Sequence, residues 1–216
     1  MEDVNEETHG EMIDILEAPG ERKLIVMPRG SLKTSVGVVA YAIWRIIRDP
    51  DIRILLESET YKNAKNLLRE IKAHLTSPAM VELFGDPVGS VWKESEITVA
   101  WRKRNRKEAT VSVGSPGVIS VGQHFDTIIN DDMNSQNNTN TKENREKIIE
   151  HYKRNIAILD PGEEYVVIGT RYHEEDLIGH ILKNEVEGGE EVSKASYSHA
   201  FENRPTLLGK QASNHG

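Results

Sequence analysis

The stretch from Leu24 to Ser35 constrains the fold of this chain more than any other part of the sequence. It reads Leu-Ile-Val-Met-Pro-Arg-Gly-Ser-Leu-Lys-Thr-Ser, which is an apolar strand, a tight turn and a Lys-Thr pair that opens a helix. This is the layout of a phosphate-binding loop. Both glycines of the common pattern G-x-x-x-x-G-K-[ST] are absent, because Met27 and Leu32 stand in their places. On these residues alone, an ordinary strand-to-helix turn is an equally good interpretation.

The chemistry of such a loop is specific. Backbone N–H groups at the helix start would face the β-phosphate of ATP, Lys33 would meet the β- and γ-phosphates, and the Thr34 hydroxyl would coordinate Mg²⁺. The predicted phosphate-binding residues are Pro28, Arg29, Gly30, Ser31, Leu32, Lys33, Thr34 and Ser35.

Length and composition narrow the class of protein. A chain of 216 residues without cysteine can bury one good core, and it has no disulfide framework or thiolate metal site, which suits a reducing interior. No apolar run is long enough to cross a bilayer. The net charge of −8 is concentrated in two acidic stretches, residues 1–21 and 185–191, outside which 27 basic residues face 23 acidic ones. This mildly basic body is compatible with transient contact to a polyanion.

Strand and helix patterns alternate along the chain. We predict core strands at residues 23–27, 52–57, 125–130 and 165–169, a β-hairpin at 97–101 and 109–114, and helices at 34–48, 60–75, 141–158 and 174–184. The helix from 60 would end at Thr76-Ser77-Pro78. Alternating elements predict an α/β fold with a mostly parallel central sheet flanked by helices and an inserted hairpin, and ligands bind such sheets at the carboxyl ends of the strands.

A second candidate site follows the strand at 125–130. Asp131 and Asp132 come directly after this apolar run. One carboxylate, Asp131, would hold Mg²⁺ through its water shell, and Asp132 would accept a proton from the attacking water. A capped turn over residues 131–134 is the alternative.

A third candidate site ends the strand at 165–169. Gly169, Thr170 and Arg171 could detect the γ-phosphate and relay its loss to the segment that follows. The alternative is a strand-to-helix turn, with Glu174 and Glu175 favouring the helix N-terminus.

The only concentrated basic patch is the turn at residues 101–107. It is more often a solvated hairpin tip than a contact to the DNA backbone or to a neighbouring subunit.

With three motifs in this order, the chain resembles the large terminase subunits of tailed bacteriophages, the ATPase motors that package DNA. The resemblance runs from about His9 to Asn184. Residues 27–34 are similar to the family's deviant Walker A motif, 128–132 to its Walker B motif with the catalytic acid, and 169–173 with Asp176-Leu177 to its coupling motif. The resemblance implies a RecA-like (ASCE) P-loop fold, adenine held near residues 9–15, and contact of Arg29 with the γ-phosphate. The catalytic residues would be Lys33, Arg29 and Asp132, where many members have Glu at the last position.

The resemblance also implies the working context. The cofactors would be ATP and Mg²⁺, and the partners double-stranded viral DNA, the portal protein, the small terminase subunit and further copies of the chain in a ring, by resemblance a pentamer. The setting would be the cytoplasm of the bacterial host, with no membrane role. A neighbour's arginine finger could come from Arg102, Arg104 or Arg106, or from none of them.

The ATPase domain would span residues 1–184. Residues 185–216 would form a polar tail or truncated linker, too short for the nuclease domain of this family, so no genome-cutting activity is expected. A helicase-like ATPase acting on DNA and a non-catalytic nucleotide-binding assembly module remain alternatives.

Overall fold

The computed structural model describes residues 4, 6–118, 122–189 and 192–196. Its strands are β1 (Arg22–Val26), β2 (Ile54–Ser58), β3 (Val88–Trp92), β4 (Glu96–Val99), β5 (Val111–Gly114), β6 (Phe125–Asp131), β7 (Leu159–Gly169) and β8 (Ser193–Ser196). Its helices are α1 (Glu6–Glu17), α2 (Tyr41–Arg48), α3 (Tyr61–Leu75), α4 (Pro78–Phe84), α5 (Lys142–Ile156) and α6 (Leu177–Ile181), with π-helical turns η1 (Ser35–Ala40) before α2 and η2 (Leu182–Val186) after α6.

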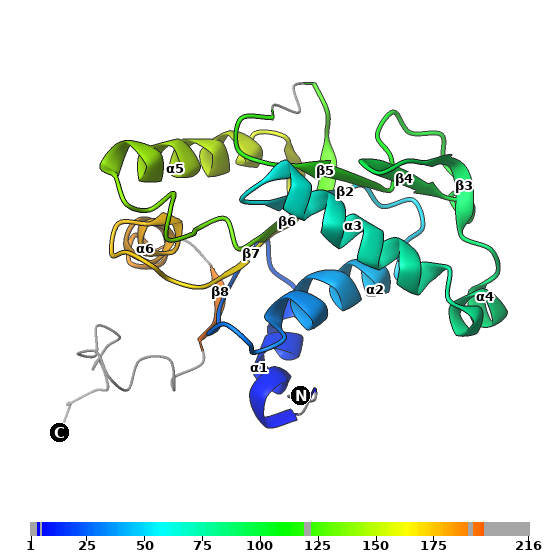
Figure 1. The fold of residues 1–216 in the computed structure, drawn as a ribbon, viewed down its shortest axis with the longest axis horizontal. Helices are drawn as coiled ribbons and strands as arrows, with labels where there is room; N and C mark the ends of the chain where they lie inside the picture. The colour runs from blue at the N-terminus through cyan, green and yellow to red at the C-terminus, as the bar shows by residue number, and fades with distance from the viewer. Residues whose placement is uncertain (1–3, 5, 119–121, 190–191, 197–216) are drawn as a thin grey trace.

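The strands form one sheet in the order β3-β4-β5-β2-β6-β7-β1-β8 (Figure 1). Neighbours from β5 to β8 run parallel to one another, and β4 is antiparallel to both β3 and β5. The predicted α/β fold with a mostly parallel sheet and an inserted hairpin is therefore confirmed. The hairpin of β4 and β5 joins the main sheet and carries β3 as an additional edge strand.

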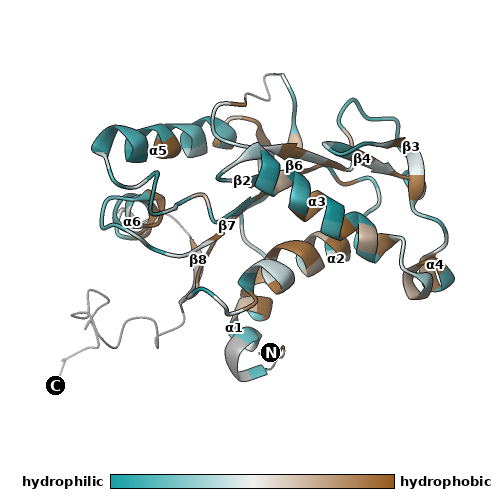
Figure 2. Ribbon diagram, in the orientation of Figure 1, coloured by the Kyte–Doolittle hydropathy of each residue, from teal (hydrophilic) through white to brown (hydrophobic). Residues whose placement is uncertain are grey.

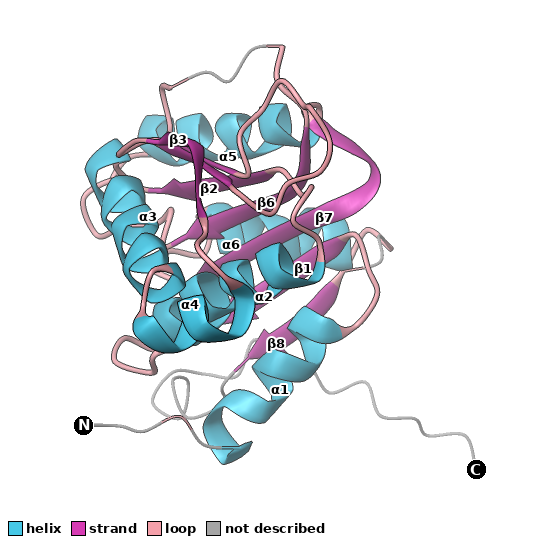
Figure 3. Cartoon of the chain, turned by 90° about the vertical axis from the view of Figure 1, so that its right-hand side faces the viewer, coloured by secondary structure: helices cyan, strands magenta, loops and turns pink. Residues whose placement is uncertain are grey.

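Helices cover both faces of the sheet (Figure 3). On β1, Ile25 packs in a core cluster with residues of α1, α2 and α3, whereas Leu24 and Val26 pack in a second cluster with residues of α5 and α6. Successive residues of a strand face opposite sides, so a continuous apolar run is what a strand buried on both faces requires.

The α5 side of the sheet is more polar than the α2 side. Figure 2 shows α5 as largely hydrophilic and α2 as rich in apolar residues. Beneath α5, the buried Glu57 at the end of β2 lies 3.0 Å from Nε2 of His151, and the Asn130 amide donates to the Tyr165 hydroxyl at 2.8 Å. Buried polar groups need such partners; the first contact connects α5 to the end of β2, and the second connects β6 to β7.

Two helix starts follow the sequence closely. Thr60 accepts a hydrogen bond from the backbone N–H of Asn63, and Thr141 accepts one from that of Asn144, both at 3.2 Å. These are N-cap contacts that satisfy an otherwise unpaired helix donor.

The last predicted helix begins later than expected, at Leu177 instead of residue 174, and it continues to Val186 through η2. The start is set by Asp176, which caps the helix by accepting from the N–H of Gly179 at 2.9 Å. A side-chain cap fixes where a helix begins more firmly than the acidic residues before it.

Several elements were not predicted from the sequence: α1, α4, β3, β8 and the first half of β7. The stop at residues 76–78 ends α3 at Leu75 as expected, but Pro78 then opens α4, because proline fits the first turn of a helix. Strand β8 lies in the segment expected to be a polar tail and pairs with β1.

Candidate nucleotide-binding site

The loop from Met27 to Thr34 connects β1 to η1 at the carboxyl edge of the sheet. The Ser31 hydroxyl donates to the Pro28 carbonyl at 2.8 Å and closes the turn. Leu32 has φ of 56°, in the left-handed region that residues other than glycine seldom occupy. Leu32 therefore takes the kind of conformation that a glycine before the lysine would adopt easily, so the missing glycine does not prevent a tight turn.

Helix α1 lies against this loop, since Nε2 of His9 is 2.8 Å from the Ser31 carbonyl oxygen. Gly37, in η1, comes close to both α1 and β7. A Cβ added there would lie 2.8 Å from Cδ1 of Ile168 and 3.2 Å from Sδ of Met12. The residues that we expect near adenine, 9–15, thus belong to α1 and contact the loop through His9.

The lysine and threonine of the loop meet the two predicted acids. Nζ of Lys33 lies 3.2 Å from a carboxylate oxygen of Asp132, and the Thr34 hydroxyl donates to Asp131 at 3.0 Å. Parallel strands bring these residues to one edge although they are almost a hundred positions apart in the chain. The predicted residues are therefore together in space.

Strand β7 lies between β1 and β6, and its end touches both. The Thr170 hydroxyl donates to the Met27 carbonyl at 3.0 Å, and the Thr170 backbone N–H donates to Asp132 at 3.2 Å. Gly169 precedes this bridge, and an added Cβ would lie 3.5 Å from the Asp132 carboxylate. Thr170 thus connects the start of the phosphate loop with the candidate catalytic acid.

The two predicted arginines are placed differently. Arg29 leaves the loop and donates from Nε to the Tyr172 hydroxyl at 2.8 Å. Arg171 donates to the Glu174 carbonyl at 3.4 Å, within its own turn. In the described part of the chain, no hydrogen bond joins Arg171 to the phosphate loop.

Asp131 has an unusual charge balance. It is 6% exposed, and this burial, followed by repulsion from the Asp132 carboxylate, raises the pKa of Asp131 to about 7. The hydrogen bond from Thr34 and the charge of Lys33 act in the opposite direction. Asp131 and Asp132 repel each other when both carboxylates are ionised, and a bound cation would relieve this repulsion.

The residues present fit Mg²⁺ bound together with phosphates. Mg²⁺ is held through one or two protein oxygens, waters and substrate phosphates, in place of a full protein cage. Thr34 and Asp131 offer two adjacent oxygen ligands. Within the described residues there is no group of three or more His, Cys, Asp or Glu side chains that could hold a metal by itself.

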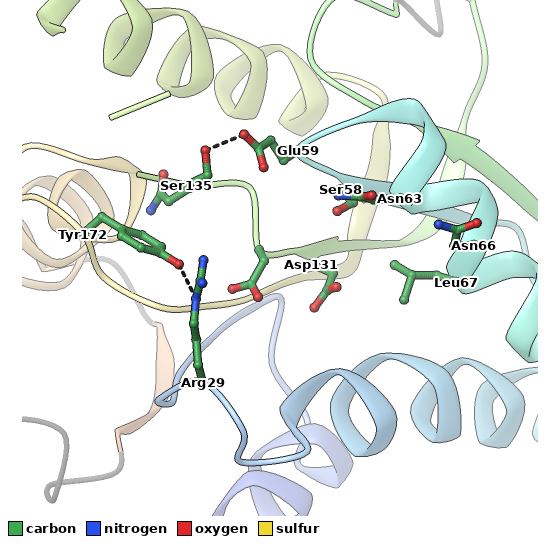
Figure 4. A pocket seen from close by; sticks show the side chains of 11 residues that line it. Arg29, Ser58, Glu59, Asn63, Asn66, Leu67, Asp131, Ser135 and Tyr172 are labelled. Atoms are coloured by element: carbon green, nitrogen blue, oxygen red, sulfur yellow. Dashed lines mark hydrogen bonds between the residues drawn. The ribbon is translucent and has the colours of Figure 1, made fainter. Parts of the chain in front are cut away.

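A pocket of about 330 Å³ opens beside the acids (Figure 4). It is lined by Arg29, Ser58, Glu59, Asn63, Asn66, Leu67, Asp131, Asp132, Asn134, Ser135 and Tyr172. Sequence reasoning missed most of these. Ser58 and Glu59 could have been found, since they lie at the carboxyl end of a core strand. Asn63 and Asn66 gave no signal, because they belong to the polar face of α3.

The basic turn at residues 101–107 lies at the opposite edge of the sheet. Arg102 donates to the carbonyls of Glu108, at 2.6 Å, and Ile52, at 3.1 Å, and Ile52 precedes the start of β2. Arg102 therefore has a packing role in this chain.

A scan against protein-family models found no match, and a search of the curated proteins also found none. Among solved structures, the chain is similar to a variant of S. cerevisiae Dbp5 bound to Nup159, Gle1, IP6 and ADP, with a TM-score of 0.55 and 14% identity over 92% of this chain and 50% of that chain. A structure of Dbp5 with Gle1 and IP6 gives a TM-score of 0.47 and 14% identity over 84% of this chain and 44% of the other.

The chain thus spans about half the length of the Dbp5 chain that it matches. At this identity the likeness shows the fold alone, and that fold is RecA-like, as predicted. The described helices include none that is long and apolar enough to cross a membrane.

Proposed function

We propose that this chain is a magnesium-dependent ATPase and, more specifically, the ATPase domain of a DNA-packaging motor like the large terminase subunits of tailed bacteriophages. The observation that carries the proposal is the double pairing of Lys33 with Asp132 and Thr34 with Asp131. A lysine, a hydroxyl and two carboxylates in this arrangement supply the parts that phosphoryl transfer from ATP to water needs.

Each residue has a distinct role in this proposal. Thr34 and Asp131 would hold Mg²⁺, which, when bound, neutralises charge on the phosphates. Lys33 binds the β- and γ-phosphates, and Arg29 stabilises negative charge on the γ-phosphate. Asp132 orients the attacking water and takes its proton as the water oxygen bonds to the γ-phosphorus, while the bond from that phosphorus to the bridging oxygen breaks and ADP leaves.

Phosphate loss would then be felt by Thr170, because it touches both the loop and Asp132. Gly169 precedes this bridge, and Arg171 would pass the change into the turn that leads to α6, where it donates to the Glu174 carbonyl. This relay from the site to a helix is the proposed coupling step.

The sequence resemblance motivates the rest of the proposal. The motor would act on double-stranded viral DNA in the cytoplasm of a bacterial host, in a ring of copies docked on the portal protein and served by the small terminase subunit. The motor domain would include η2 and β8, which pairs with β1, and would therefore extend beyond the boundary at residue 184 expected from the sequence.

The first test is ATP turnover by the purified chain with Mg²⁺, with and without double-stranded DNA. We expect Lys33→Ala to reduce turnover at least a hundredfold, an order of magnitude set by removal of a charge that stabilises the transition state. Lys147→Ala, on the exposed face of α5, is the matched control and should leave turnover unchanged. Equal turnover in wild type and Lys33→Ala would refute an ATPase at this site.

Two rivals share the RecA-like fold. A helicase-like ATPase would separate strands of a duplex without procapsids, whereas the packaging motor would not. A non-catalytic assembly module is favoured by the departures of the loop from the glycine pattern, and it predicts nucleotide binding without turnover in the presence of DNA, portal protein or small subunit.

A further inference from the structure

Arg29 lines the pocket and contacts the aromatic ring of Tyr172, which lines it as well. Its Nε donates to the Tyr172 hydroxyl at 2.8 Å, and its guanidinium carbon lies 5.5 Å from the centre of the Tyr172 ring. Figure 4 shows the two side chains approaching each other from the loop after β1 and the segment after β7. The same ring therefore provides a hydrogen-bond acceptor and a cation–π partner.

The charge of Arg29 is not neutralised in the way that the charge of Lys33 is. Lys33 has a carboxylate partner in Asp132. Among the described residues, no carboxylate forms an ion pair with Arg29, although Glu59, Asp131 and Asp132 line the same pocket. A guanidinium held at a pocket without an acidic partner is suited to bind an anionic oxygen, which it can do with two N–H groups at once.

Tyr172 stands on a firmly held turn. Its backbone N–H donates to Asp176 at 2.8 Å, and the N–H of His173 donates to the same carboxylate oxygen at 3.1 Å. Asp176 is fully buried and caps α6 through Gly179. The ring is thus attached to a fixed segment, whereas Arg29 is on an exposed loop and has a long side chain with much rotamer freedom to lose.

We infer that Tyr172 is a positioning residue, which holds Arg29 over the pocket for the terminal phosphate of a nucleoside triphosphate. This inference rests on the proposed function. Tyr172 contributes by ordering Arg29 before the ligand arrives, so that less side-chain entropy is lost on binding. Because only the terminal phosphate is absent from a diphosphate, the consequence is selectivity for triphosphate over diphosphate.

The test is equilibrium binding of ADP and of a non-hydrolysable ATP analogue to the full chain with Mg²⁺. For Tyr172→Ala we expect analogue binding to weaken by roughly tenfold, the upper size expected when one long, rotamer-rich side chain must be ordered on binding. ADP binding should stay within about twofold. Tyr172→Phe keeps the ring without the hydroxyl and should recover part of the loss, to about threefold.

The pair is tested further by a double-mutant cycle with Arg29→Ala. If Tyr172 acts through Arg29, adding Tyr172→Ala to Arg29→Ala costs little more. Additive losses would overturn the inference, as would equal weakening of ADP and analogue, which indicates general damage to the site. Tighter analogue binding by Tyr172→Ala would also overturn it, because Tyr172 would then hold Arg29 away from the ligand.

Lys33→Ala separates this inference from the proposed function. If Lys33→Ala loses nucleotide and Tyr172→Ala binds like wild type, the role of Tyr172 is wrong and the nucleotide site stands. If Lys33→Ala binds both nucleotides like wild type, the proposed function fails and the inference fails with it.

Discussion

In the interior of the sheet, Ile54, Leu56 and Ile129 are fully buried among other apolar side chains, whereas at its carboxyl edge Leu32 and Asp132 have positive φ, 56° and 43°. The interior follows the ordinary rules of packing. The edge holds strained backbone and a buried, destabilised carboxylate. Such features persist only where the surrounding structure maintains them, and they concentrate at functional sites. The stability gained by packing in the interior therefore offsets the unfavourable backbone conformations and the buried charge at the edge.

The largest expected effect comes from emptying the interior. Ile71 on α3 is fully buried in the core, so Ile71→Ala should lower the free energy of unfolding by about 2–5 kcal/mol through lost burial and the cavity left behind. Urea unfolding measures this. Arg69→Ala, exposed on the same helix, should change it by less than about 0.5 kcal/mol. If folded Ile71→Ala also lost nucleotide affinity, the division between interior and edge would not hold.

At the carboxyl edge, substitution of Asp131 should raise the free energy of unfolding, by less than Ile71→Ala lowers it. Its pKa is raised from 3.8 to about 7, so the folded state favours the protonated form. The preference of the folded state for protonated Asp131 stabilises it at low pH. Without metal, this stabilisation is lost as the pH rises from about 4 to about 7. Asp131→Asn, which does not titrate, should raise the free energy of unfolding by about 1–3 kcal/mol at pH 8, an advantage that disappears towards pH 4.

The matched control is the neighbouring acid. Asp132→Asn removes the partner of Lys33, which is 5% exposed, and leaves that charge buried without its carboxylate. It should therefore destabilise the protein at pH 8. A destabilisation by Asp131→Asn that is the same at pH 5 and pH 8 would contradict the account of Asp131.

The smallest effect tests backbone strain at Leu32. Glycine is normally less favourable than alanine inside an ordered segment, but at φ of 56° the order should reverse, with Leu32→Gly more stable than Leu32→Ala by about 0.5–1 kcal/mol. Leu83 in α4 is exposed and provides the comparison, since there the glycine variant should be the less stable by about 1 kcal/mol. If the glycine variant were less stable than the alanine variant at both positions, the backbone at Leu32 would not be strained.

The sequence predicted the core strands and the meeting of Lys33 and Thr34 with the two acids. It could do so because apolar runs identify buried strands, and the parallel arrangement then brings their carboxyl ends together. The helices predicted from residues 60 and 141 begin directly after Thr60 and Thr141, whose cap contacts involve residues close in the chain.

Other features left no local signal. Strand β8 reads Ser-Lys-Ala-Ser and joins the sheet by backbone pairing with β1, so no apolar alternation marks it. The contact of Arg29 with Tyr172 joins residues 143 positions apart, and neither residue type implies the other. Nor does a leucine in the sequence reveal that its backbone is left-handed.

The place of β7 between β1 and β6 has a mechanical consequence. Neighbouring strands are about 4.8 Å apart, so the intervening β7 keeps β1, which leads into the phosphate loop, roughly 10 Å from β6, which carries the acids. The sheet cannot shorten this interval without breaking its own hydrogen bonds. Any closure around a nucleotide must therefore come from movements of the loops and side chains, because the spacing between β1 and β6 is fixed.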